Sequence, residues 1–262
     1  MIDNHMHTKL CKHAEGDLFE YVEKAIFKGI SEIAFTDHIP LPESFDLAHR
    51  MQLNDMEKYA RWIQQARGIY PEITIRFGIE ADYYEGLEKY TESFISRYDF
   101  DIVIMSVHFI HHWPEGNWVF EYDFPEKSKK EIYKDYLSTV KRGIETGLFD
   151  VLGHVDIIKS PGDSLIEIVP DDVNTLLETL KNNDMSLEIN TSGYRKKVEE
   201  PFPGFDWLSL IKEKSVSLTT GSDAHHPDQV GLKFEDLYQR LQKEDFVNLV
   251  TYDRREIIEI GI

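Results

Sequence analysis

Short apolar runs typical of β-strands alternate with longer amphipathic stretches typical of helices along most of this 262-residue chain. The predicted strands cover residues 2–5, 30–36, 73–79, 101–106, 151–153, 186–189 and 215–219. The predicted helices cover residues 18–28, 56–69, 88–98, 126–146, 173–183, 207–214 and 227–243. Such alternation implies parallel strands joined by right-handed crossovers. About seven units predict an α/β fold with a closed or nearly closed barrel, and an open doubly wound sheet is the alternative.

Side chains that can bind a metal ion follow nearly every predicted strand. In chain order these are His5 and His7, Asp37 and His38, Glu80, His108, His154, and finally Asp223 and His225. In a parallel barrel the functional site forms at the carboxyl ends of the strands, so we expect these groups to converge. Side chains two positions apart in a strand project to the same side, so His5 and His7 can share one ion. Imidazoles mixed with carboxylates suit Zn²⁺, Mn²⁺ or Fe²⁺.

Composition limits the partners and the compartment. The formal net charge of −19 argues against nucleic-acid binding, which normally needs a basic face. An acidic chain can still bind a phosphate ester if divalent cations reverse the local charge. The lone cysteine, Cys11, fits a reducing compartment. No apolar run approaches the roughly 20 residues of a membrane helix and no signal peptide is visible, so we expect a cytoplasmic protein without membrane attachment. The sequence does not indicate an oligomeric state.

Seven segments carry a resemblance to a known family. They read DNHMHT at 3–8, CKH at 11–13, FTDH at 35–38, GIEADY at 78–83, SVHF at 106–109, GHVD at 153–156 and GSDAH at 221–225. In this order they resemble the polymerase and histidinol phosphatase superfamily, called PHP, and within it the monofunctional histidinol-phosphate phosphatases. The resemblance implies a single PHP-type metallophosphatase domain over residues 1–262, folded as a distorted TIM-like (β/α)7 barrel.

The resemblance also implies a metal-ligand set, because all nine ligand positions of the family are filled here. A first ion would be held by His5, His7, Glu80 and Asp223, a second by Glu80 as a bridge with His108 and His154, and a third by His13, His38 and His225. The implied cofactors are two to three divalent metal ions, with zinc, manganese and iron as the candidates.

The implied reaction is hydrolysis of L-histidinol phosphate to L-histidinol and phosphate, a step of histidine biosynthesis. A hydroxide bridging two ions would attack phosphorus, because coordination lowers the pKa of water to about 7. No side chain is assigned as a catalytic acid or base. Arg195 is predicted to bind the substrate phosphate through its planar guanidinium, and Lys159 is a second candidate. The long connections 39–54 and 109–124 are candidate active-site loops.

Three other interpretations remain open at this stage. A PHP phosphoesterase acting on another small ester or a nucleotide would use the same metals and differ in its substrate loops. A non-catalytic PHP module would keep the metal site only as a structural brace. Amidohydrolase chemistry also uses a His-x-His start, but the segments at 11–13 and 221–225 favour the PHP family. Phosphate release from a panel of esters discriminates among them.

Overall fold

The structure is a computed structural model that describes residues 1–121 and 127–262. Within these ranges, a seven-stranded sheet has the order β1-β2-β3-β4-β7-β8-β9, and its neighbouring strands pair in parallel. The strands are β1 (Ile2–Met6), β2 (Glu32–Phe35), β3 (Thr74–Asp82), β4 (Ile102–Ser106), β7 (Val151–Leu152), β8 (Ser186–Asn190) and β9 (Leu218–Gly221). All seven predicted strands are therefore present.

The two edges of the sheet meet just beyond β1 and β9. The backbone N–H of Asp223 donates to the carbonyl of His5 over 2.7 Å, and that of His7 donates to the carbonyl of Ala224 over 3.0 Å. Met6 and Ala224 form the parallel bridge between these hydrogen bonds. This closure confirms the predicted distorted (β/α)7 barrel and rules out an open doubly wound sheet.

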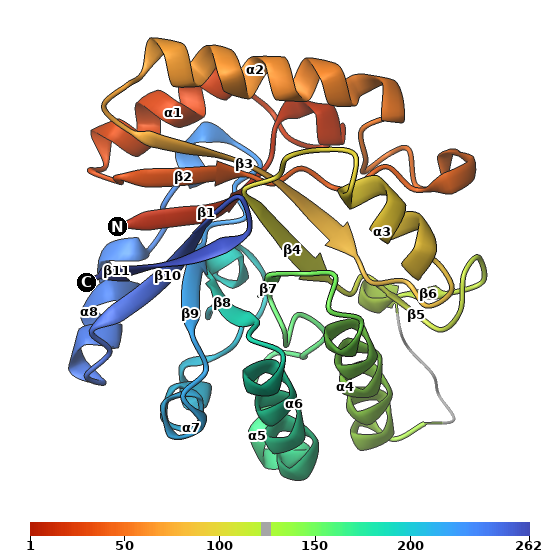
Figure 1. Cartoon of the computed structure of the whole chain (residues 1–262). Helices are drawn as coiled ribbons and strands as arrows, with labels where there is room; N and C mark the ends of the chain where they lie inside the picture. The colour runs from red at the N-terminus through yellow and green to blue at the C-terminus, as the bar shows by residue number, and fades with distance from the viewer. Residues whose placement is uncertain (122–126) are drawn as a thin grey trace.

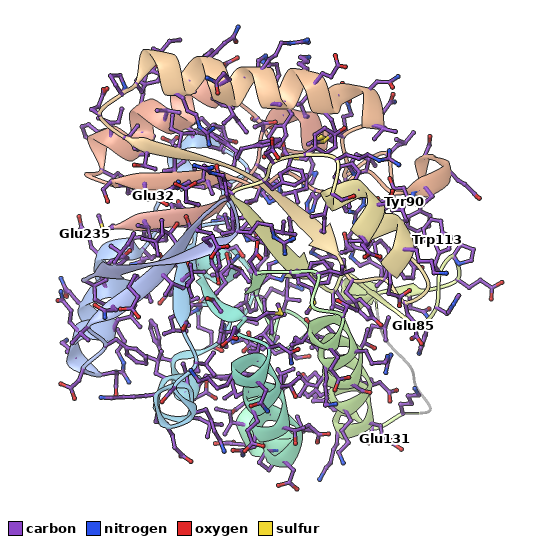
Figure 2. All side chains as sticks on the ribbon, viewed as in Figure 1. Glu32, Glu85, Tyr90, Trp113, Glu131 and Glu235 are labelled. Carbon is purple, nitrogen blue, oxygen red and sulfur yellow. The ribbon has the colours of Figure 1, made fainter. Side chains whose placement is uncertain are left out.

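Helices surround the barrel on its outside (Figure 1). They are α1 (Leu18–Phe27), α2 (Met56–Ile69), α3 (Glu88–Ile95), α4 (Lys129–Glu145), α5 (Leu165–Ile168), α6 (Pro170–Asn182), α7 (Leu208–Lys214) and α8 (Phe234–Lys243). Charged side chains occupy their outer faces, as Glu131 on α4 and Glu235 on α8 illustrate (Figure 2). Among the described residues, no helix combines the length and the apolar character that a membrane crossing requires.

Four predicted helices differ from the structure at their first residues. The helix predicted from 173 begins at Pro170, and the helix predicted from 207 begins at Leu208. The helix predicted over 227–243 is broken: a short 3-10 turn over Pro227–Gln229 precedes α8, which begins at Phe234. Gly231 and Lys233 have φ of +57° and +63°, and this left-handed backbone interrupts a right-handed helix. The helix predicted over 126–146 begins at Lys129, and its first predicted residue, Glu126, lies outside the described residues.

A C-terminal antiparallel hairpin of β10 (Asn248–Asp253) and β11 (Glu256–Gly261) was not predicted. It packs across the amino-terminal end of the barrel. The Thr251 hydroxyl donates to Glu32 over 2.5 Å, and the Tyr252 hydroxyl donates to the carbonyl of Asp150 over 2.9 Å. Its side chains complete a small apolar cluster that consists of Ala34, Ile102, Ile104, Val151, Val250 and Tyr252. This end of the barrel is thus filled, and the predicted ligands lie at the opposite end.

Both candidate active-site loops lie at the carboxyl end of the strands. The connection after β4 forms a short hairpin of β5 (Phe109–Ile110) and β6 (Asn117–Trp118). Residues 122–124 of this predicted loop lie outside the described residues. The connection 39–54, which follows β2, contains the 3-10 turn Pro42–Ser44, and a second 3-10 turn, Leu53–Asp55, leads into α2.

Candidate metal centre

The structure brings all nine predicted metal ligands together at the carboxyl end of the barrel. Seven of them line a cavity of about 280 Å³: His13, His38, Glu80, His108, His154, Asp223 and His225. The other two, His5 and His7, are fully buried beneath it. Both come from the end of β1, where successive same-side positions point into the barrel mouth.

Glu80, near the end of β3, lies at the centre of this cluster. Its Oε2 is 3.3 Å from Nε2 of His5 and 3.4 Å from Nε2 of His7. Its Oε1 is 3.1 Å from Nε2 of His154 and 3.8 Å from Nε2 of His108. One carboxylate oxygen therefore faces the pair from β1, and the other faces the pair from β4 and β7. This placement suits a carboxylate that bridges two ions.

The remaining predicted ligands form a third group beside His7. The rings of His13 and His225 have centroids 4.4 Å apart, and those of His13 and His38 are 5.5 Å apart. The ring of His225 stacks on that of His7 at 4.1 Å. His7, His38 and His225 can direct one nitrogen each toward a common point.

Several nitrogen atoms of the cluster that could bind a metal ion are buried and have no hydrogen-bond partner among the described residues. They are Nε2 of His5, both ring nitrogens of His7, Nδ1 of His154 and Nε2 of His225. Nδ1 of His38 and Oε2 of Glu80 lie 2.8 Å from each other. A buried polar atom without a partner is costly unless something else satisfies it. Two ligands bound tetrahedrally to one zinc ion at about 2.1 Å lie roughly 3.4 Å apart. The distance of 3.2 Å between Nε2 of His7 and Oδ1 of Asp223 is close to that value, so these residues fit divalent ions.

Carboxylates outside the cluster orient two of the ring ligands. Glu188 Oε1 lies 2.8 Å from Nδ1 of His5, and Asp82 Oδ1 lies 2.8 Å from Nδ1 of His108. An ionised carboxylate only accepts hydrogen bonds, so each contact places the ring proton on Nδ1. The Nε2 lone pair of each ring is thereby left facing the cluster, which is the usual support of a metal-binding histidine.

The pKa shifts put only part of the cluster in the form that binds a metal ion. Burial lowers the pKa of His5, His7 and His108, but the neighbouring carboxylates outweigh it and raise the pKa of each, so these rings lose a proton when an ion binds. Burial raises the pKa of Glu80, but the surrounding imidazoles outweigh this effect and hold the pKa well below its usual range. Asp223 behaves in the same way, with burial opposed by His5 and His7, so its pKa is also held low. Burial lowers the pKa of His38 to about 3 and leaves a neutral ring. Ionised carboxylates and neutral imidazoles are the forms that bind metals.

The walls of the cavity above the ligands combine aromatic, acidic and basic side chains. They include Asp46, His49, Arg50, Trp118, Phe120, Ile157 and Lys196. Asp46, His49 and Arg50 come from the connection 39–54, and Trp118 and Phe120 come from the connection after β4. Both loops predicted from their length thus contribute side chains to the cavity.

The two predicted substrate contacts lie apart from this lining. Arg195, in the 3-10 turn after β8, donates to the carbonyls of Ser222 and Asp223 over 2.9 and 2.7 Å. Lys159 is buried, and its Nζ lies 2.8 Å from Asp156 and 2.9 Å from Glu200. Substrate binding by these two residues stays a prediction. Lys196, in contrast to Arg195 and Lys159, lines the cavity.

Four side chains that shape the site were not predicted from the sequence: Glu188, Asp82, Arg50 and Lys196. Two of them could have been found because side chains two positions apart in a strand project to the same side of the sheet. Asp82 lies two positions after Glu80 on β3, and Glu188 lies two positions before Asn190 at the end of β8. Arg50 and Lys196 belong to irregular segments, where sequence periodicity carries no information about side-chain direction.

The fold and the donor cluster define a class of protein. Residues 3–192 match the PHP domain family, and the chain belongs to that family. It is 35% identical over 245 residues to the probable histidinol-phosphatase of Deinococcus radiodurans, covering 92% of this chain and 93% of that protein. It is 31% identical over 266 residues to the histidinol-phosphatase of Bacillus subtilis, covering 91% and 98%.

A solved structure supports the fold. The histidinol phosphate phosphatase of Lactococcus lactis, in complex with zinc, L-histidinol and phosphate, superposes with a TM-score of 0.83 at 23% identity. The superposition covers 98% of both chains. The predicted PHP family and barrel are therefore both confirmed.

Proposed function

We propose that this protein is a metal-dependent phosphoric monoester hydrolase that converts L-histidinol phosphate to L-histidinol and phosphate, a reaction of histidine biosynthesis. The observation that carries the proposal is the likeness to two histidinol-phosphatases over nine-tenths or more of each chain. The convergence of unpaired buried donors at the mouth of the barrel supports it independently, because such donors fit the metals of a phosphatase. On this proposal the 262 residues work as one catalytic domain.

The proposed ligands retain the predicted assignment. His5, His7, Glu80 and Asp223 hold the first ion, Glu80, His108 and His154 the second, and His13, His38 and His225 the third. Zinc, manganese and iron suit this mixture of imidazole and carboxylate. When bound, two to three divalent ions supply positive charge for the phosphoryl oxygens and a water of lowered pKa.

The other residues bind and orient. Glu188 and Asp82 hold the rings of His5 and His108 with Nε2 toward the ions. Lys196 is an exposed residue that lines the cavity, where its positive charge can attract the phosphate. This charge and those of the bound ions would offset the negative charge of the acidic chain at the place where an anionic substrate must bind.

The far wall of the cavity suits the organic part of the substrate. Trp118 and Phe120 provide aromatic faces for an imidazole ring, and their ring centroids lie 5.9 Å apart. Asp46 supplies a carboxylate to the lining of the cavity, where it can attract the ammonium group of the substrate. A small cationic ester therefore fits this cavity better than a polynucleotide, so we propose a small-molecule substrate and no nucleic-acid or membrane partner.

The test is phosphate release from L-histidinol phosphate by the metal-reconstituted protein. Nucleotides and sugar phosphates are assayed in parallel, and a chelated sample is the control. We expect a marked preference for L-histidinol phosphate that the chelator abolishes. Activity confined to another ester would contradict the proposed substrate but keep the metal chemistry. A metal-loaded protein inactive on every ester would instead favour a non-catalytic PHP module.

A further inference from the structure

Arg50 carries a buried positive charge in the irregular connection 39–54. Its side chain is only 2% exposed. Nη1 lies 2.6 Å from Oδ2 of Asp82 and donates to the carbonyl of Ile39 over 3.2 Å, and Nε donates to Oδ2 of Asp46 over 3.0 Å. Burying a guanidinium is unfavourable unless it is paired. The buried charge of Arg50 is therefore stabilised by two carboxylates, those of Asp82 on β3 and Asp46 on the loop.

The first of these carboxylates, that of Asp82, also contacts a proposed metal ligand. Asp82 ends β3 and is fully buried. While Oδ2 pairs with Arg50, Oδ1 lies 2.8 Å from Nδ1 of His108 and accepts from its backbone N–H over 3.3 Å. Arg50 thus fixes the carboxylate that fixes the ring of a proposed metal ligand.

The second carboxylate, that of Asp46, also contacts a residue of the cavity wall. Asp46 lies 2.6 Å from Nδ1 of His49 through Oδ1, while its second oxygen accepts from Arg50. The ring of His49 packs 5.1 Å from that of Trp118 and 5.2 Å from that of His13. One guanidinium consequently contacts both a carboxylate of the cavity wall, Asp46, and the carboxylate that holds the proposed ligand His108.

The loop itself has little regular structure to hold it. Glu43, Ser44 and Asp46 all have φ near +56°, a conformation that non-glycine residues adopt only when their surroundings impose it. The 3-10 turn Pro42–Ser44 provides few backbone hydrogen bonds. The ion pairs of Arg50 are therefore well placed to decide whether the loop keeps this conformation.

We propose that Arg50 is a positioning residue that couples the conformation of loop 39–54 to metal binding at His108. This inference rests on the proposed metal-dependent function. Coupling between two sites is reciprocal, so an ion at His108 stabilises the loop conformation described above, and that conformation raises the affinity for the ion. Loading of the metal centre thus favours the conformation in which Asp46, His49 and Arg50 line the cavity.

The test compares metal affinity with hydrogen exchange of a peptide covering residues 41–51. In the wild type, metal loading should protect this peptide. Arg50→Met keeps the length of the side chain but removes its charge. It should weaken the binding of one ion about 10- to 100-fold, as loss of an outer partner of a ligand does, and should abolish the protection. Arg50→Lys, which keeps the charge, should restore part of both properties.

Arg67→Met is the matched control. Arg67 also pairs with one aspartate, Asp101 at 2.6 Å, and donates to one carbonyl, that of Ile75 at 2.7 Å. These contacts lie at the opposite end of β3 and β4. The control should lower thermal stability without changing metal affinity or the exchange of the loop.

Three results decide the matter. Wild-type metal affinity and metal-dependent protection in Arg50→Met would overturn the coupling and leave the proposed function intact. Equal exchange of the loop in the metal-free and metal-loaded wild type would also overturn it, even if the variant fails to fold. A wild type that binds no divalent ion would overturn the proposed function, and the coupling with it.

Discussion

Glu188 offers the sharpest test of how the metal centre is held. It is 1% exposed, and both of its oxygens are occupied. Oε1 accepts from Nδ1 of His5 over 2.8 Å, and Oε2 accepts from the backbone N–H of His154 over 2.9 Å and from Nδ2 of Asn190 over 3.0 Å. Every group around the carboxylate is a donor, so the site requires an acceptor on both sides.

Glu188→Gln replaces one acceptor by an NH₂ group without changing the size of the side chain. Either orientation of the amide directs its N–H groups at a donor, so the contact with His5 or the contacts of Oε2 are lost. A hydrogen bond to a charged group contributes about 1.5–3 kcal/mol. If the proton on Nδ1 of His5 loses its acceptor, we expect metal affinity to fall about 10- to 100-fold.

Metal affinity is measured by competition with a chromophoric chelator, and phosphatase activity is followed as a function of free metal. We expect the Gln variant to need a higher metal concentration for half-maximal activity. Glu178→Gln is the control, because Glu178 is exposed and its ion pair with Lys214 should contribute about 0–1 kcal/mol. Either orientation of the amide loses a contact to one proposed ligand, His5 or His154, so wild-type metal affinity in Glu188→Gln would refute the claim that this carboxylate positions them.

Removing the metals with a chelator should lower the melting temperature, because the buried ligand atoms lose the ion that binds them, and reloading should restore it. An unchanged melting curve would contradict this expectation. Gly221→Ala would place a Cβ 2.0 Å from Oε1 of Glu188 and 2.5 Å from Cβ of His5, so metal content by elemental analysis should drop. Gly68→Ala, in α2 and with open space around it, should raise stability by about 0.5–1 kcal/mol in denaturant unfolding. Arg195→Ala should lower kcat/KM for L-histidinol phosphate while metal content stays near wild type. Loss of metal together with activity would show that Arg195 acts by holding the carbonyls of Ser222 and Asp223 in place and not by binding the phosphate.

The strands and their chemistry were predictable because the relevant information is local. Buried parallel strands are short apolar runs, and the polarity of a parallel barrel brings all their carboxyl ends to one face. His5, Glu80 and His154 could therefore be placed together without knowing a single distance. The helices were predictable for the same reason, and α2 matches its predicted range of 56–69.

Features that depend on contacts between distant segments could not be predicted. The hairpin β10–β11 looks like an ordinary pair of apolar runs, and only the barrel end that it fills explains its place. The contacts that Arg195 and Lys159 make within the fold are of this kind, because their polar groups meet backbone carbonyls and a carboxylate of distant segments. Substrate binding by these two residues stays a prediction. The direction of a long side chain on a loop depends on which partners surround it, and periodicity does not encode those partners.

By itself the amino-acid sequence determined the class of fold and the face of the barrel that carries the candidate site, and it predicted the metal ligands. The first two follow from the strand–helix period and from residue types at strand ends, whereas the full ligand set is what the resemblance to the PHP family implies. Only the tertiary structure decided which oxygen of Glu80 faces which histidines, which carboxylates orient the rings, and how Arg50 ties a loop to the site. The physical reason is that hydrogen bonds and ion pairs depend on distances and angles of a few ångströms, which arise only when segments far apart in the chain pack together.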